Sequence, residues 1–199
     1  MKKHLPANLA RTANRPVWQI IFTIIIIAIL FVPRHLFAQK MHAGPSDTTK
    51  IIVKPTYPKV YGYLSFILPL ETYSSGNFTG NFNGTTSIGF PIGVNVLYSD
   101  KFGFSYEFTP TIKASGAGSK MSNLLFDPGT MFRFKYGFTI ISRLAFETSG
   151  RYGFTPVFNQ VYAQTKNVNY FVALSLPARF GNNEPSSIGL NLQIGFIFN

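Results

Sequence analysis

The stretch Ile88-Gly-Phe-Pro-Ile-Gly-Val-Asn-Val-Leu-Tyr98 decides the fold, because every even-numbered residue in it is apolar. Its odd positions include Gly89, Gly93 and Asn95, which are small or polar. Residues 102–109 repeat the pattern as Phe-Gly-Phe-Ser-Tyr-Glu-Phe-Thr. A period of two is typical of a β-strand with one apolar face and one polar face.

The charged residues follow the same alternation along the rest of the chain. Those that fall in or beside strands after Ile88 all have odd numbers: Glu107, Lys113, Asp127, Arg133, Lys135, Arg143, Glu147, Arg151 and Arg179. In a water-soluble antiparallel sheet the polar face would lie outside and carry many more charges. A sparse polar face and a continuous aromatic and aliphatic face indicate a transmembrane barrel, apolar toward lipid and polar toward the lumen.

Composition agrees with a membrane protein and excludes several other classes. The 199 residues are 46% hydrophobic and only 13% charged, whereas soluble domains carry about 25% charged residues. The absence of Cys excludes disulfides and thiolate metal sites. The net charge is +11, and five of these charges fall in residues 1–38, which have no acid. With no basic run elsewhere, we expect no nucleic-acid partner.

The N-terminal segment predicts export. A basic stretch precedes a thirteen-residue, predominantly apolar run, Ile20 to Val32, a length within the roughly 7–15 of a signal peptide core and below the roughly 20 of a spanning helix. We predict a signal peptide over 1–38, cleaved after Ala38. A cut after Ala43, or an uncleaved anchor, is the alternative. Residues 39–58 are polar and predict a short periplasmic linker.

Residues 59–199 are predicted to form an all-β, antiparallel up-and-down transmembrane β-barrel of eight strands. The expected strands are 59–70, 87–98, 102–113, 124–134, 138–147, 151–161, 167–179 and 188–198. A constant parity across a turn requires an odd number of turn residues, so we expect three-residue hairpins at 99–101, 135–137 and 148–150. With both termini in the periplasm, the outer loops would be 71–86, 114–123, 148–150 and 180–187.

This pattern resembles the small, eight-stranded outer-membrane β-barrels of Gram-negative bacteria. The resemblance rests on the signal segment and on the closing strand Ile188-Gly-Leu-Asn-Leu-Gln-Ile-Gly-Phe-Ile-Phe198. It implies that the chain lies in the cell outer membrane, in contact with outer-membrane lipid. It also implies that the barrel-assembly machinery reads the C-terminal strand, whose last aromatic residue is Phe198. In this chain Asn199 follows that residue.

Catalysis is not expected. The three histidines are His4, His35 and His42, so the predicted barrel has none to serve as a general base. No phosphate-binding loop, calcium loop or histidine cluster is present, and we expect no cofactor and no metal.

The inward charges predict a structural network instead. Its members are Glu107, Asp127, Arg133, Arg143, Glu147, Arg151 and Arg179. The expected register places Glu147 opposite Arg151 and Arg143 diagonal to Asp127, within reach for ion pairs. Eight strands leave room for little more than side chains. We therefore predict a non-enzymatic barrel with a packed, salt-bridged lumen, serving as an envelope or anchor element or binding through its outer loops. A small pore or transporter is the alternative.

Overall fold

A computed structural model describes residues 55–198, so the predicted signal peptide and most of the predicted linker lie outside the described residues. The described chain is an antiparallel sheet with one short turn of 3₁₀ helix, η1 (Lys135–Gly137). Its strands are β1 (Lys59–Ser74), β2 (Asn77–Gly80), β3 (Thr85–Gly89), β4 (Ile92–Leu97), β5 (Phe102–Ser115), β6 (Gly118–Arg133), β7 (Phe138–Glu147), β8 (Tyr152–Gln164), β9 (Val168–Ser175), β10 (Ala178–Phe180) and β11 (Ser187–Phe198). Over residues 55–198 there is no helix of the length and apolarity that crossing a membrane requires.

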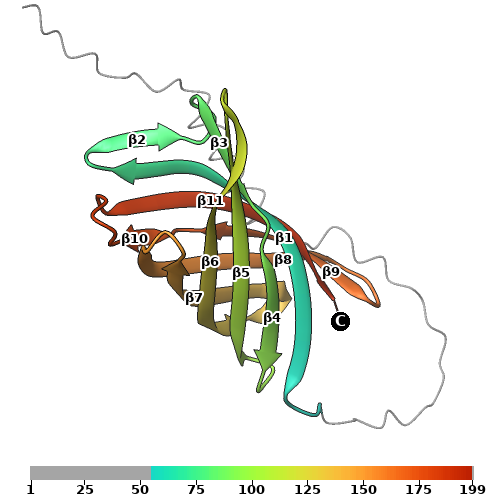
Figure 1. Cartoon of the computed structure of the whole chain (residues 1–199). Coiled ribbons are helices and arrows are strands. Elements are labelled where there is room, and N and C mark those ends of the chain that lie inside the picture. The colour runs from blue at the N-terminus through green and yellow to red at the C-terminus, as the bar shows by residue number, and fades with distance from the viewer. Residues whose placement is uncertain (1–54, 199) are drawn as a thin grey trace, which may run out of the picture. The chain divides into compact units, whose positions relative to one another are not determined.

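The sheet closes on itself into a transmembrane β-barrel (Figure 1). Neighbouring strands pair in chain order, and β11 returns to pair with β1 from Tyr63↔Ile197 to Ser74↔Ser187. Strands β3 and β4 share one position of the ring, as do β9 and β10, while β2 only folds back on β1. The predicted eight-stranded, all-β architecture is therefore confirmed. Closure leaves no unpaired edge facing lipid.

The two faces of the wall follow the parity predicted from the sequence. Among the described residues, every exposed large apolar side chain has an even number except Tyr73 and Met121. The buried polar and charged side chains all have odd numbers and point into the lumen. An apolar exterior around a polar interior suits a wall that faces hydrocarbon.

The two exceptions come from β-bulges, which the sequence did not reveal. The pairing of β1 with β11 shifts by one residue between Pro69 and Glu71. The pairing of β5 with β6 shifts in the same way beside Thr111. Because one extra residue reverses the inward and outward sense of everything beyond it, Tyr73 and Met121 point outward.

Two predicted strands are each divided in the structure. The expected strand 87–98 is broken between β3 and β4 at Pro91, and the expected strand 167–179 is broken between β9 and β10 at Pro177. Proline has no N–H for the ladder and is confined to edges and irregularities of sheets. Both proline carbonyls still accept backbone N–H groups, from Ser65 at 3.0 Å and from Gly189 at 2.8 Å.

The three predicted three-residue hairpins, 99–101, 135–137 and 148–150, are present in the structure. The N–H of Tyr98 donates to Phe102 O at 3.0 Å across the turn 99–101. The turns 135–137 and 148–150 end in Gly137 (φ 78°) and Gly150 (φ 86°). This left-handed backbone favours glycine and is the conformation expected at the last position of such a loop.

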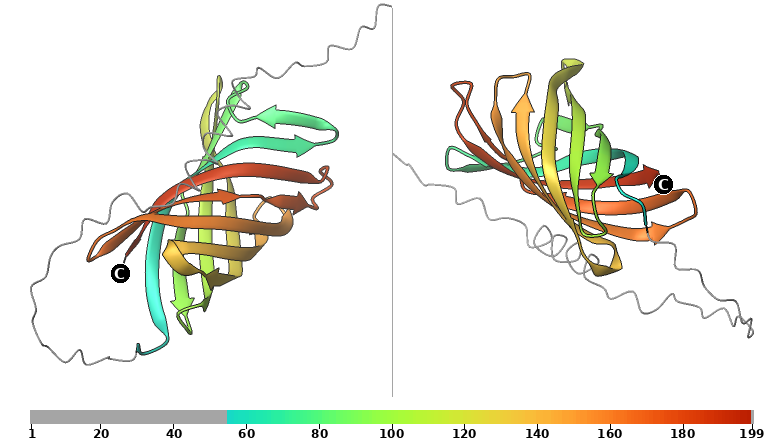
Figure 2. Two further views of the ribbon diagram at one scale, coloured as in Figure 1. Left: turned by 180° about the vertical axis from the view of Figure 1, so that it is seen from behind. Right: turned by 90° about the horizontal axis from the view of Figure 1, so that it is seen from below.

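The two longest predicted outer loops are wrong, because their residues continue as strands. β1 runs on to Ser74 and β2 folds back beside it, in place of most of the loop 71–86. β5 and β6 likewise extend to a turn at 116–117, in place of the loop 114–123. Strands beyond the apolar belt face water and need no apolar side chains, so their polar composition resembled that of loops. Figures 1 and 2 show the β1–β2 and β5–β6 hairpins diverging at this end of the barrel, the hairpin end.

The hairpins diverge because β2 and β3 share no ladder within the described sheet. Asn81 bridges the gap with its side-chain amide, which donates to Ser87 O at 2.9 Å and accepts from Ser87 N at 2.7 Å. The amide thus pairs the backbone of β3 as a strand would. The opposite end, where Lys59 begins β1 and Phe198 ends β11, is called the terminal end.

Leu144→Arg tests the outward face. Leu144 is 58% exposed in the middle of β7, so a charge there would meet hydrocarbon and should lower the free energy of unfolding by about 2–4 kcal/mol. The control is Tyr136→Arg at the terminal-end turn, where the cost should be about 0–1 kcal/mol. Urea unfolding in lipid vesicles measures both, and equal losses would contradict the assignment of the faces.

Candidate functional site

Two cavities lie in the lumen of the described barrel, one toward each end. The smaller, of about 190 Å³, opens toward the terminal end and is lined by residues such as Tyr61, Leu97 and Asn159. The larger, of about 530 Å³, opens toward the hairpin end and reaches residues such as Thr79 and Ser149. We call them the terminal chamber and the hairpin chamber. Arg143 borders both chambers, so the barrier between them passes through this side chain.

A central plug of four buried side chains, Tyr63, Glu107, Arg143 and Gln193, fills the lumen between the chambers. Arg143 Nη1 lies 2.9 Å from Glu107 Oε2, and its Nη2 donates to Tyr63 Oη at 2.9 Å. The hydroxyl of Tyr63 donates to Glu107 Oε2 at 2.8 Å, and Gln193 Nε2 donates to the same oxygen at 3.3 Å. None of the four is more than 4% exposed. Of the buried side-chain polar atoms of these four residues, only Arg143 Nε lacks a hydrogen-bond partner. A polar cluster bonded to this extent resists opening, because any one loss strands a buried group.

Glycines on the neighbouring strands let two plug residues reach across the lumen. Tyr63 lies opposite Gly93, and Gly93 lies opposite Glu107 on the next strand. A Cβ on Gly93 would overlap the Tyr63 ring, so the missing side chain is what allows the ring to pass. Arg143 passes Gly129 in the same way and reaches Glu107, two strands from its own.

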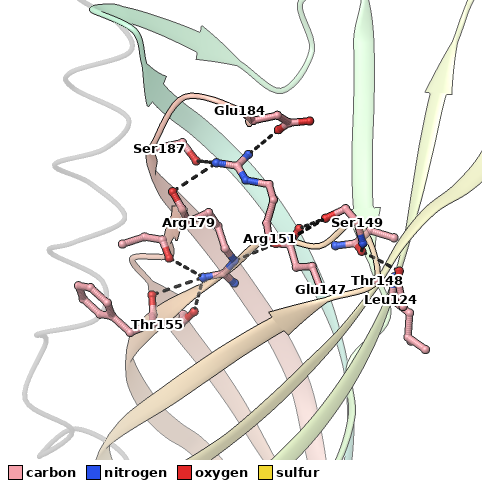
Figure 3. Close-up of polar contacts among 12 residues, drawn as sticks. Leu124, Glu147, Thr148, Ser149, Arg151, Thr155, Arg179, Glu184 and Ser187 are labelled. Carbon is pink, nitrogen blue, oxygen red and sulfur yellow. Dashed lines mark hydrogen bonds and ion pairs between the residues drawn. The ribbon is translucent and has the colours of Figure 1, made fainter. Parts of the chain in front are cut away.

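A second ion pair lies nearer the hairpin end (Figure 3). Arg179 Nε lies 2.8 Å from Glu147 Oε1, and both side chains are at most 15% exposed. Arg179 Nη1 also donates to Thr155 Oγ1 at 3.0 Å. Gly153 on β8 lies directly opposite Arg179 of β10, so no side chain blocks the guanidinium on its way to β7.

Arg151 forms a third ion pair at the rim. Its Nη1 lies 3.0 Å from Glu184 Oε2, and Nη2 donates to the Pro185 carbonyl and to Ser187 Oγ, each at 3.0 Å. Glu184 is 54% exposed, so this pair contributes little free energy but fixes the loop before β11 against β8.

The ion pairs predicted from the register are not those in the structure. The backbone register itself is as expected: Arg143 lies opposite Gly129, and the N–H of Glu147 donates to Arg151 O at 2.8 Å. However, Glu147 pairs with Arg179 and Arg151 with Glu184, while Arg143 pairs with Glu107. The prediction considered adjacent strands alone, whereas arginines that pass glycines reach one strand further.

The other two predicted network members have no ion pair among the described residues. Arg133 ends β6 at the terminal end, is exposed, and borders the terminal chamber. Asp127 is 2% exposed, borders the hairpin chamber, and its Oδ1 has no hydrogen-bond partner. The structure therefore brings five predicted residues into ion pairs and leaves these two without one.

Sequence reasoning missed Tyr63, Gln193 and Glu184. Tyr63 and Gln193 have odd numbers, so parity predicts that their side chains point inward. Nothing in the sequence distinguished them from inward residues that only pack the lumen. The inward glycines, such as Gly93, were the usable feature: each marks a place where a neighbour's long side chain crosses. Glu184 lies in a loop, where parity has no meaning.

The arrangement offers little for catalysis. Residues 55–198 contain no His, and in them no group of three or more His, Cys, Asp or Glu could hold a metal ion. Glu107 and Glu147 are each held by an arginine. Just before β1 in the sequence, the hydroxyl of Tyr57 donates to Asp100, and this bond to a carboxylate raises the pKa of Tyr57.

Comparison with known proteins gives likeness of fold without a family. No family model matches this chain, and no curated protein matches its sequence. A designed transmembrane β-barrel is 10% identical, with 72% of this chain and 97% of that chain covered and a TM-score of 0.46. The designed barrel TMB2.3 is 11% identical, with 71% and 94% covered and a TM-score of 0.41.

A natural protein has a similar, weaker likeness. Ail, the attachment invasion locus protein of Yersinia pestis, solved with the heparin analogue sucrose octasulfate, is 9% identical, with 70% of this chain and 97% of Ail covered and a TM-score of 0.37. At these identities and scores, the likeness carries no information on ligand or activity.

A double-mutant cycle tests the ion pair of Glu147 with Arg179. Each of Glu147→Gln and Arg179→Met should cost about 2–3 kcal/mol of unfolding free energy, because each strands a largely buried partner, and the double mutant should cost less than the sum by about 1–3 kcal/mol. The matched cycle of Glu147→Gln with Arg151→Met should be additive. Coupling to Arg151 and none to Arg179, measured by urea unfolding in vesicles, would contradict the pairing.

Proposed function

We propose that this chain is a non-enzymatic outer-membrane β-barrel with a closed lumen, which serves as an envelope or anchor element and binds at its hairpin end. The transmembrane barrel is the established part of this statement. The outer membrane and the binding role are the proposal, and the arrangement of the lumen and of the hairpins supports them.

The observation that carries the closed lumen is the central plug. Glu107 accepts from Arg143, Tyr63, Gln193 and, at 3.2 Å, from Thr109. A solute crossing the barrel would have to break this set of bonds in a lumen only eight strands wide. The plug is built for stability, since each side chain is both a packing element and a hydrogen-bond partner.

The hairpin end supports a binding role. β1–β2 and β5–β6 form ordered walls that continue beyond the chamber, so this end presents strands in place of long loops. Phe78 on β2, Phe82 in the segment between β2 and β3, and Met121 on β6 are 57%, 69% and 66% exposed. Lys113 and Lys120 add positive charge beside them. Apolar side chains with nearby lysines fit a partner that combines acyl or aromatic groups with negative charge.

Placement in the outer membrane rests on the N-terminal segment and on the closing strand. The predicted signal peptide over 1–38 would deliver the chain across the inner membrane. In β11 the outward residues Ile188, Ile194 and Phe198 are all exposed, as suits a strand that the barrel-assembly machinery would read. Recovery with the outer-membrane fraction of a Gram-negative host supports this placement, and recovery in the soluble periplasm contradicts it.

A small transporter is the second candidate, because one observation favours it. The two chambers share Arg143 and Val157 as lining residues. The plug and Val157 lie between them, so a rearrangement of few side chains would connect both ends.

Conductance across a planar bilayer separates the two candidates. The wild-type barrel should be electrically silent, whereas Tyr63→Ala should give discrete current steps, because it removes a plug side chain opposite a glycine. Tyr61→Ala is the matched control: it lies two residues earlier on β1, borders the terminal chamber and leaves the plug intact. Steps from the wild type would favour the transporter, and a silent Tyr63→Ala barrel that still shows heat-dependent gel mobility would show that Tyr63 is not the barrier.

A further inference from the structure

The charges of the hairpin chamber do not balance. The charged residues that line it are five acids, Glu71, Glu107, Asp127, Glu147 and Glu184, and four cations, Lys113, Arg143, Arg151 and Arg179. Glu107 and Glu147 each hold an arginine. Asp127 is left as one excess negative charge in the wall of the chamber.

The Asp127 carboxylate is buried, which is unusual for a carboxylate without an ion pair. Its side chain is 98% buried by area, with 2% exposed, and Oδ1 has no hydrogen-bond partner. It lies directly opposite Glu107 in the β5–β6 ladder, where side chains with like charge repel. Buried charges in proteins are paired or bind a ligand, so the carboxylate needs a cation that the described chain does not supply.

A second unpartnered group lies on the same chamber. Ser175 borders the hairpin chamber from β9, is 1% exposed, and its Oγ has no hydrogen-bond partner. Around the ring β9 is three strands from β6, which carries Asp127. Arg143 Nε and Arg151 Nε are further buried groups without a partner on this chamber, and both are donors, whereas Asp127 Oδ1 and Ser175 Oγ can accept. Buried polar groups without partners on separate walls of one cavity indicate a cavity made for a polar occupant.

We propose that the hairpin chamber binds one primary ammonium group, with the Asp127 carboxylate as its anchor. An ammonium group has three N–H donors, so it can satisfy Asp127 Oδ1 and still donate to Ser175 Oγ or to water. A metal ion would need several converging oxygen ligands, and the described residues offer no such group. The chamber volume of about 530 Å³ is within the roughly 300–1,000 Å³ of small-molecule sites, so the ammonium can belong to a small organic molecule.

This site is independent of the proposed function, because the chamber opens at the hairpin end whether or not the plug conducts. The ligand class is therefore a small amine that reaches the barrel from the hairpin side. The surrounding arginines are held by their own acids, so the Asp127 carboxylate supplies the selectivity for positive charge.

Methylammonium is the probe, and tetramethylammonium is its matched control with the same charge and no N–H. The full chain is folded into phosphatidylcholine vesicles and unfolded in urea in a series of samples. Across the series methylammonium replaces tetramethylammonium step by step, so that the ionic strength stays constant. Binding to the folded state alone should raise the folded-to-unfolded ratio about elevenfold at ten times the dissociation constant. Asp127→Asn should abolish the rise, while Glu184→Gln, which removes a carboxylate at the rim of the same chamber, should keep it.

Equilibrium dialysis of radiolabelled methylammonium against the folded wild type tests the site without a variant. We expect one ion bound per chain, displaced by unlabelled methylammonium and not by tetramethylammonium. No binding, or a stability that depends on pH but not on either ion, would overturn the proposal, because a proton would then neutralise Asp127. A rise in stability that survives Asp127→Asn would also overturn it.

Discussion

A sheet that lies in hydrocarbon must pair every backbone N–H and C=O within the chain, and the rest of this structure depends on how that requirement is met. An open sheet would expose an edge to lipid at a cost of several kcal/mol for each unpaired group. The pairing of β11 with β1 removes the edge. Once the wall is closed and faces lipid, apolar residues are required outside, and every charged side chain of the spanning region must lie within the ring.

The ring is narrow, and this explains the design of the lumen. Charged side chains confined among eight strands have little water to solvate them, so each needs a partner of opposite charge or a hydrogen bond. Glycines on inward positions make room for this. The side chains of Tyr63, Arg143 and Arg179 each pass an inward glycine and reach an acid two strands away. These glycines are Gly93, Gly129 and Gly153, respectively. The same crossings separate the two chambers, and they leave Asp127 as a buried acid without an ion pair among the described residues.

Much of the fold could be predicted from the sequence, because the parity of a strand is a local property. Alternation gave the faces, the eight positions of the ring and the three-residue turns at 99–101, 135–137 and 148–150. It failed beyond the bulge at Pro69, since one extra residue reverses the faces and nothing in a single sequence marks its position. It also treated the polar outer parts of β5 and β6 as loops, because it assumed that strands end where the apolar pattern ends.

The site was harder to predict than the fold, because it depends on contacts between strands that are not neighbours. The inward direction of Glu147 and Arg179 followed from their odd numbers. Their ion pair, however, requires β10 to lie beside β8 and Gly153 of β8 to lie between the two side chains. The expected register identifies the neighbour of each residue on the adjacent strand. When that neighbour is glycine, a long side chain passes over it and reaches the strand beyond. The plug depends on the same effect: a long side chain starts on one strand, passes a glycine on the next and reaches an acid on a third.

The central claim is that the plug separates two chambers, and thiol labelling tests it most directly, because the chain has no cysteine of its own. Thr111→Cys would place a thiol in the hairpin chamber and Val161→Cys one in the terminal chamber. In vesicles with uniformly oriented barrels, a membrane-impermeant maleimide added at the hairpin end should label the first variant and leave the second unlabelled. Labelling of both variants at similar rates from that one side would contradict the account.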